Sequence, residues 1–274
     1  MRQIKETLFY IFMTVFCLIW IYPFLWMVSA SFKTQDEFFS NGLSLIVENI
    51  TIDNLIRAWN EANFGQYFFN SVIITLGTIL IVVLTTATCG YVLGRYSFKG
   101  KKFIYFLLIS SMFVPMEFAI IPIYDLIKMM GLMNTRLGVI LAEAGGNHII
   151  FILLFATFFS RIPKELEEAA VMDGCSFFKT FFTIMLPLSK PVIVSVVIMQ
   201  FIWSWNSFLL PLILTLNEPD ARPLSVGLYA LQGENVVDWT GIAAGGTIAI
   251  VPIIVIFLFL QRYFVDGIAG SVKG

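Results

Sequence analysis

The sequence predicts an all-α, polytopic membrane protein with six transmembrane helices. Of its 274 residues 58% are hydrophobic and the mean hydropathy is +0.87, whereas soluble domains are usually about 45–50% apolar. Apolar runs of about 20 residues, long enough to cross a bilayer, also recur along the chain. The predicted spans are Leu8–Ala30, Ser71–Gly94, Phe103–Tyr124, Leu137–Ser160, Pro191–Leu214 and Thr240–Leu260.

The first apolar run follows a short basic start that contains Arg2 and Lys5. The run is longer than the apolar core of a signal peptide, so we expect an uncleaved first span. The predicted organisation is then a first span with an extracytoplasmic segment (1–70), a five-span core that includes a loop at 161–190 (71–262), and a C-terminal tail (263–274).

Basic residues are distributed unequally between the two sets of loops. Twelve of the 17 Lys and Arg residues fall at the termini and in the loops around 95–102 and 161–190, and five fall in the opposite set. Cytoplasmic loops carry the excess of Lys and Arg in membrane proteins. Both termini and the 161–190 loop are therefore predicted to be cytoplasmic.

The loop at 161–190 is a charged, amphipathic insert between the fourth and fifth predicted spans. Glutamates dominate its polar side, whereas helices that lie in lipid headgroups usually carry Lys and Arg there. This composition favours docking on a protein, with the Ala169/Ala170 side as the docking face. The apolar residues at helical spacing are Ile162, Leu166, Ala169 and Ala170.

The same insert carries signals for two short helices. Pro163 suits the first turn of the first helix, and Gly174 is placed to end it in a left-handed conformation. Ser176 can cap a second helix, and Leu186-Pro187 is expected to stop that helix before the fifth span.

Polar residues inside three predicted spans fall at similar depths. Such groups are costly in lipid and mark either a water-filled pathway or polar contacts between helices, and both interpretations remain open. Pro115, Pro122 and the pair Gly145-Gly146 are expected to break two helices where the backbone must line a cavity or be buried in protein. The candidate pathway residues are Glu117, Glu143, Asn147, His148, Gln200, Trp203, Asn206 and Ser207.

The sequence lacks the common signatures of catalytic and metal sites. It has no G-x4-G-K-[ST] phosphate loop and no HExxH motif, and its single histidine and three scattered cysteines do not form a metal-site pattern. No catalytic or metal-binding residue is therefore predicted, and any energy source is expected to come from another chain.

The insert contains EAA-x3-G-x9-I-x-LP, formed by Glu168, Ala169, Ala170, Gly174, Ile184, Leu186 and Pro187. This motif resembles that of the inner-membrane permease subunits of binding-protein-dependent ABC importers. The whole chain is similar to the six-span, maltose-transporter-type permeases of the carbohydrate-uptake branch. The supporting segments are Ser31–Thr34, Asn70-Ser71, Ile121-Pro122, Gly131-Leu132, Ile162-Pro163, Trp203–Phe208, Pro211, Gln261–Phe264 and Val272–Gly274.

The resemblance implies a type I ABC importer permease fold with a cytoplasmic coupling helix between spans four and five. It implies a bacterial inner-membrane protein that pairs with a homologous second permease, two cytoplasmic ATPases that bind ATP and Mg, and an extracytoplasmic solute-binding protein. The imported solute would be a sugar or oligosaccharide, and neither a cofactor in this chain nor a nucleic acid is implied. The coupling residues would be Glu168, Ala169, Ala170, Asp173, Gly174, Leu186 and Pro187.

The resemblance also assigns two peripheral segments. The loop Thr215–Trp239 would approach the binding protein, and the tail Asp266–Gly274 would reach towards the ATPases.

Trp203 and Trp205 would either stack on sugar rings or serve as packing. Two departures affect the pathway: Phe155–Phe158 lies where the family often has an Arg-Gln pair, and Ser207 lies where an acid is usual.

Three other functions compete with sugar import. A permease of the same fold would carry glycerol phosphate, a peptide or a metal complex, although no predicted span contains Arg or Lys to bind a phosphate. An ion-coupled secondary transporter would use Glu117, Glu143 and His148 as proton relays but would leave the insert unexplained. An intramembrane enzyme would need a nucleophile–base or metal constellation, which the sequence lacks.

Overall fold

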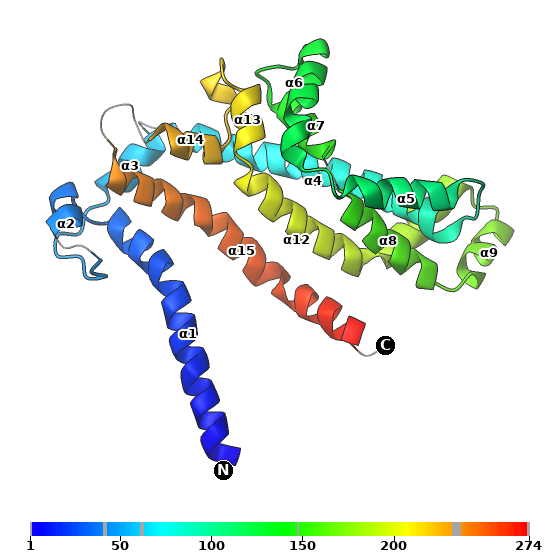
Figure 1. Ribbon diagram of the computed structural model, residues 1–274, viewed down its shortest axis with the longest axis horizontal. Helices are drawn as coiled ribbons and strands as arrows, with labels where there is room; N and C mark the ends of the chain where they lie inside the picture. The colour runs from blue at the N-terminus through cyan, green and yellow to red at the C-terminus, as the bar shows by residue number, and fades with distance from the viewer. Residues whose placement is uncertain (1, 41–42, 61–62, 147, 232–236, 273–274) are drawn as a thin grey trace. The chain divides into compact units, whose positions relative to one another are not determined.

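The computed structural model describes residues 2–40, 43–60, 63–146, 148–231 and 237–272, which form helices and loops without a strand (Figure 1). The predicted all-α class is confirmed. The chain divides into two compact units. The first contains Met1–Phe68 with Leu224–Pro252, and the second contains Phe69–Pro223 with Ile253–Gly274.

Three described helices are long and apolar enough to cross a membrane, and they match the first, second and sixth predicted spans. They are α1 (Arg2–Ser31), α4 (Phe64–Arg95) and α15 (Trp239–Val272), the longest ribbons in Figure 1. In the most apolar window of α1 no residue is buried against the rest of the chain. This helix therefore presents its apolar side chains to whatever surrounds it.

One further predicted span is a bent helix pair, and the fifth begins just after the bend of another pair. The fourth consists of α7 (Arg136–Ala144) and α8 (Ile149–Arg161), which meet at 57°. The helical segment Phe177–Leu188 meets α12 (Lys190–Asn206) at 77°, and α13 (Leu209–Leu214) completes the fifth predicted span. If each pair counts as one span, the described residues contain up to five.

The third predicted span is not one helix. It consists of α5 (Lys101–Ser111), the 3-10 turn η1 (Met116–Ala119) and α6 (Ile120–Met129). Pro115 has an extended backbone, with φ −62° and ψ 136°, and separates α5 from η1 as expected. Pro122 does not break a helix: it lies in the first turn of α6, where its missing N–H is not needed. The count of six spans remains a prediction.

The first unit contains α1, α2 (Gln35–Ser40), α3 (Asp53–Asn60), α14 (Leu224–Ala230) and the first half of α15. Two buried charged residues organise its segment between α1 and α3. Lys33 donates to the Ser44 carbonyl at 2.6 Å, and the Glu37 carboxylate accepts from the backbone N–H groups of Glu48 and Asn49 at 2.7 and 3.1 Å. These contacts compensate for burial of the two charges.

The second unit is built on two clusters of buried side chains. One joins α4, α8, η2 (the π-helix Phe181–Met185) and α12, and it includes Tyr91, Phe155 and Phe159. The other joins α4, α6, α7 and α13, of which α6, α7 and α13 also lie close to one another along their backbones. The remaining elements of this unit are α9 (Glu165–Met172), α10 (Phe177–Thr180), α11 (Leu186–Leu188) and η3 (Pro219–Ala221).

Candidate functional site

A mainly apolar cavity of about 460 Å³ that contains several polar side chains lies within the second unit, and its volume is typical of small-molecule sites. Most candidate pathway residues line it, together with apolar residues of α6, α7 and α13. The candidates at the cavity are Glu117, Glu143, His148, Gln200, Trp203 and Ser207. The sequence therefore identified a group of residues that the fold brings together. Whether a solute passes through this cavity remains a prediction.

Two candidate pathway residues do not belong to this set. Asn206 is exposed at the end of α12, where its side-chain amide donates to the Ile202 carbonyl at 2.7 Å and does not line the cavity. Asn147 lies outside the described residues.

Glu143 connects two sides of the cavity. It is buried near the end of α7, and the Ser204 hydroxyl of α12 donates to its Oε2 atom. The Thr78 and Ser207 hydroxyls also lie beside this carboxyl. Glu143 thus combines the two interpretations considered for the polar residues, because it both lines the cavity and holds two helices together.

Ser204 was missed by the sequence reasoning. It lies four residues after Gln200 and three before Ser207, which is the spacing of one helix face. A serine in an apolar helix is weak evidence by itself, but this spacing was a usable signal.

Two aromatic rings in the wall of the cavity, those of Trp203 and His148, pack on the fully buried ring of Phe151 behind them. Trp203 stacks on Phe151 at a centroid distance of 5.0 Å, and His148 stacks on Phe151 at 5.8 Å. Trp203 keeps 48% of its surface exposed, so it can present a flat face to a solute. Trp205 differs: it is buried and stacks on Phe201 at 5.4 Å, which makes it a packing residue.

Three buried polar atoms at the cavity have no hydrogen-bond partner among the described residues. They are Oε1 of Glu143, Oε1 of Gln200, a residue that is 2% exposed, and Nδ1 of His148. The other ring nitrogen of His148, Nε2, lies 2.9 Å from the Glu143 carbonyl. Buried polar atoms normally have partners, so a solute or water in the cavity would satisfy them.

The expected breaks at Pro115 and at Gly145-Gly146 line cavities, as the sequence predicted. A second cavity of about 520 Å³ is lined by all three residues, and it shares His148 and Gly146 with the first. Interrupted helices around a cavity are typical of transporter binding sites. Among the described residues, no group of three or more His, Cys, Asp or Glu side chains is arranged to hold a metal ion.

The expected glycine bend of the 161–190 insert is present. Gly174 has φ +77° and follows the end of α9, while Ser176 caps α10 by accepting a hydrogen bond from the Lys179 N–H. Glu168 lies exposed in the first turn of α9, and Asp173 forms its C-terminal cap. The start differs slightly: α9 begins at Glu165 with Lys164 as its N-cap, so Pro163 lies just before the helix.

Two expectations for the insert were wrong. Leu186-Pro187 does not stop the second helix, because the π-helical turn Phe181–Met185 comes directly before it and the helix continues to Leu188. The wider turn and the position of Pro187 at the start of α11 accommodate a residue without an N–H. The apolar face is also divided: Ala169 is exposed, whereas Ala170 is only 3% exposed and packs within the chain.

The exposed apolar side chains of the insert lie elsewhere on α9, α10 and η2. They are Leu166, Val171, Met172, Phe178 and Phe182. Exposed apolar groups of this size on a charged insert indicate an interaction surface.

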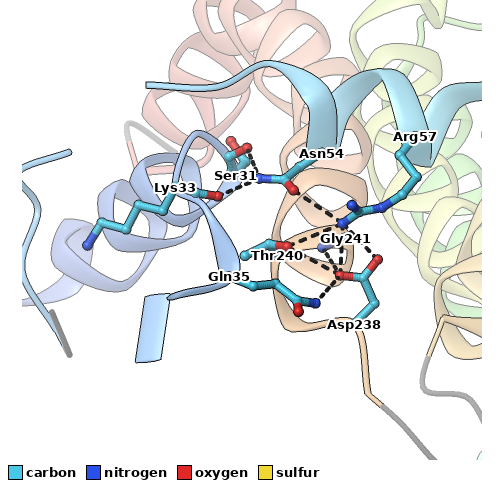
Figure 2. Close-up of polar contacts among 8 residues, drawn as sticks. All are labelled: Ser31, Lys33, Gln35, Asn54, Arg57, Asp238, Thr240 and Gly241. Atoms are coloured by element: carbon cyan, nitrogen blue, oxygen red, sulfur yellow. Dashed lines mark hydrogen bonds and ion pairs between the residues drawn. The ribbon is translucent and has the colours of Figure 1, made fainter. Parts of the chain in front are cut away.

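A polar network in the first unit joins the end of α1, α3 and the start of α15 (Figure 2). Arg57 pairs with Asp238, with Nη2 3.0 Å from each carboxylate oxygen. Asn54 is buried beside Arg57 and donates to the Ser31 and Lys33 carbonyls at 3.1 and 2.7 Å. This network holds the C-terminal end of the Thr215–Trp239 loop; residues 232–236 of that loop lie outside the described residues.

Asp238 also forms the N-terminal cap of α15. Its Oδ1 atom accepts from the Gly241 N–H at 2.9 Å and from the Thr240 hydroxyl at 3.2 Å. A Cβ atom on Gly241 would lie 2.4 Å from the carboxylate, so glycine is needed there. Gln35 adds a longer contact of 3.4 Å to the same oxygen.

The N-terminal end of the same loop is held within the second unit. Asn70 is fully buried in α4 and donates to the Asp220 and Arg222 carbonyls at 2.7 and 2.8 Å. Arg222 in turn donates to the Leu216 carbonyl at 2.9 Å. These contacts explain why a polar side chain is buried at this position. Asn70 takes the place of water as the hydrogen-bond donor to two backbone carbonyls.

Comparison with known proteins decides the family. The sequence profile described as "Binding-protein-dependent transport system inner membrane component" matches residues 86–270. The chain belongs to this family. As a member, this permease is a multi-pass inner-membrane component of an ABC transport system.

Relatives match this permease over nearly its whole length. It is 38% identical to the "Probable ABC transporter permease protein YurM" of Bacillus subtilis (strain 168), over 99% of this chain and 90% of YurM. It is 34% identical to the "Diacetylchitobiose uptake system permease protein NgcG" of Streptomyces coelicolor, over 92% and 82% of the two chains. It is 32% identical to the "Melibiose/raffinose/stachyose import permease protein MelC" of Bacillus subtilis (strain 168), over 92% and 91%.

The fold of this permease matches a solved ABC importer. The TM-score is 0.82 against a chain from the crystal structure of a bacterial ABC transporter involved in the import of the acidic polysaccharide alginate, covering 96% of this permease and 97% of that chain. At 21% identity the match shows the fold alone. The expected ABC importer permease fold is thus confirmed.

Proposed function

We propose that this permease moves a sugar or oligosaccharide across the bacterial inner membrane, driven by ATP hydrolysis on separate subunits. Its partners would be a homologous second permease, two cytoplasmic ATPases that bind ATP and Mg, and an extracytoplasmic solute-binding protein. The carrying observation is a cavity with an aromatic wall and a few polar side chains, in a chain whose relatives include permeases named for diacetylchitobiose and for melibiose, raffinose and stachyose.

The composition of the cavity suits a sugar. Trp203 offers an exposed ring face against which the apolar face of a pyranose can pack, and Gln200 and Ser207 supply amide and hydroxyl groups for its hydroxyls. The unpartnered atoms of Gln200 and His148 would receive hydrogen bonds from the sugar. A single flat aromatic wall with a few convergent polar groups is typical of small-molecule sites.

A phosphorylated solute fits less well. The described residues that line the cavity include Glu117 and Glu143 but neither Lys nor Arg. A phosphate group would meet two carboxylates and would lack the cationic partner that it normally requires. Sugar is therefore favoured over glycerol phosphate.

The insert supports ATP-driven coupling. The excess of Lys and Arg in its set of loops favours a cytoplasmic position, where the exposed apolar residues of α9 and α10 would dock on an ATPase. Closure of the two ATPases would then move α9 and shift the permease between inward-open and outward-open states. Glu168, Asp173 and Gly174 would shape this docking element, and the C-terminal tail would reach towards the ATPases.

The proposal is tested by reconstituting the permease with its partners in proteoliposomes. The solutes are diacetylchitobiose, an arabinotriose, maltotriose and raffinose, with glycerol 3-phosphate for comparison. We expect one of the sugars, presented by the binding protein, to stimulate ATP hydrolysis and to accumulate inside. Stimulation by glycerol 3-phosphate alone, or uptake without ATP, would contradict the proposal.

The docking role of the insert is tested with Glu168→Gln and Gly174→Ala. Both variants are expected to insert into the membrane normally, because the two positions are exposed and outside the apolar cores. Both should weaken association with the ATPases or reduce sugar-stimulated hydrolysis. Normal transport and normal stimulation in both variants would show that the coupling assignment is wrong.

A further inference from the structure

A buried arginine ends α4 and binds the insert. The Arg95 side chain is 4% exposed and forms an ion pair with Glu167 of α9, with Nη2 2.6 Å and Nε 2.7 Å from Oε2. Its Nη1 also donates to the Ile162 carbonyl at 2.5 Å and to the Phe159 carbonyl at 3.3 Å. All three guanidinium nitrogens are thus engaged, because Arg95 occupies the place where α8 ends and α9 begins.

Tyr91, one turn earlier on α4, holds the other oxygen of the same carboxylate. Its hydroxyl donates to Glu167 Oε1 at 2.6 Å. The ring is fully buried and packs within 5.5 Å of Phe159 on α8 and Phe181 on η2. Both carboxylate oxygens of Glu167 are therefore bound by α4, and the tyrosine that binds one of them is fixed in the apolar core.

Two glycines bring α4 close enough to α8 for these contacts. A Cβ atom on Gly90 would lie 2.4 Å from Phe155 Cβ, and one on Gly94 would lie 2.5 Å from the Ala156 carbonyl oxygen. The two helices therefore pack with their backbones nearly in contact, as the Gly90-x3-Gly94 pattern predicts. This approach places Arg95 directly over the C-terminal carbonyls of α8.

We propose that Arg95, Tyr91 and Glu167 form a transmission joint that makes α9 move together with α4 and α8. The proposal rests on the proposed coupling function of the insert. The continuous helix α8 runs from its N-cap His148, which lines the cavity, to Arg161 beside the joint. A displacement of α9 is therefore passed along α8 to the cavity wall.

The three residues are positioning residues, since none of them is in the cavity. Two guanidinium N–H groups of Arg95 converge on one oxygen of Glu167 and the Tyr91 hydroxyl holds the other, so the charge-assisted contact has a defined geometry. A joint that transmits the direction of a movement requires such a geometry. Glu167 differs in this respect from Glu165 and Glu168, which are exposed on the same helix. The joint thus assigns different roles to neighbouring glutamates: Glu168 belongs to docking, and Glu167 to transmission.

The test uses the complete reconstituted transporter and measures sugar imported per ATP hydrolysed, with the sugar that stimulates the wild type. Glu167→Gln keeps the side-chain shape but removes the charge, Tyr91→Phe removes one hydrogen bond, and Glu165→Gln makes the same chemical change at an exposed position. We expect Glu167→Gln to assemble with both ATPases and to hydrolyse ATP while the import ratio falls at least about fivefold. Tyr91→Phe should lower the ratio about twofold, and Glu165→Gln should match the wild type.

Each result of this experiment decides the proposal. Wild-type ratios in both Glu167→Gln and Tyr91→Phe would overturn the joint while leaving the sugar-import function standing. If Glu167→Gln fails to assemble, the import ratio of Tyr91→Phe alone tests the joint, because this variant retains the ion pair between Arg95 and Glu167. A wild-type complex that no sugar stimulates would overturn the proposed function itself, and the joint with it. An equal fall in Glu165→Gln would show a general effect of charge on α9 and would also overturn the joint.

Discussion

Replacing Gly94 by alanine tests the close packing of α4 on α8. The new Cβ would lie 2.5 Å from the Ala156 carbonyl oxygen and 3.2 Å from two further backbone atoms of Ala156. Favourable contacts with carbon lie at about 3.5 Å or more, so the helices would have to separate by up to about 1 Å. Overpacking of this kind costs about 1–3 kcal/mol, and the better helix propensity of alanine offsets about 1 kcal/mol. A Cβ contact of 2.5 Å with a backbone atom belongs to the upper part of this range, about 2–3 kcal/mol, so the expected net loss is about 1–2 kcal/mol.

The assay is thermal unfolding of the purified transporter complex in detergent, followed by the loss of helical circular dichroism. Cys89→Ala is the matched control, because Cys89 is exposed on the same part of α4. Gly94→Ala should unfold at a lower temperature than both the wild type and this control. Stability equal to or above that of the wild type would refute the backbone contact between α4 and α8, since helix propensity would then be the only effect acting.

Three other changes have specific expected outcomes. Ser204→Ala should lower the unfolding temperature of the complex, by about 1–3 kcal/mol in free energy, because the buried Glu143 carboxylate loses a donor; an unchanged temperature would contradict this contact. Asp238→Ala should lower the free energy of unfolding by about 1–2 kcal/mol, because α15 loses its N-terminal cap, whereas Asp238→Asn should retain most of that free energy. Chemical denaturation in which Asp238→Asn is the less stable variant would count against the cap. Gly174→Ala should weaken ATPase binding in a pull-down more than Gly174→Asn, because Asn tolerates φ +77° better; equal binding would exclude backbone strain there.

The sequence was sufficient for features that depend on local backbone chemistry. The left-handed bend at Gly174, the cap at Ser176 and the break at Pro115 each follow from one residue type and its immediate neighbours. Most of the cavity was also predictable, because Gln200, Trp203 and Ser207 share a helix face and charged residues such as Glu143 are costly in lipid.

Features that depend on tertiary contacts were not predictable. Pro187 is a strong helix breaker in isolation, but the preceding π-helical turn lets the helix continue. The sequence places Ala170 in an apolar stripe that is expected to be exposed, but the fold buries this residue. The contact of Arg95 with Glu167 joins residues 72 positions apart, and neither residue is distinguished in sequence from the other charged residues of the loops predicted to be cytoplasmic.

The cap of α15 also limits the order in which this part of the chain can change during evolution. A side chain at position 241 is sterically excluded as long as Asp238 keeps its carboxylate there. Loss of Asp238 would in turn leave Arg57 without its ion-pair partner. An exchange of Gly241 for a larger residue is therefore tolerable only after Asp238 has changed, so the two positions should change in that order in diverging sequences.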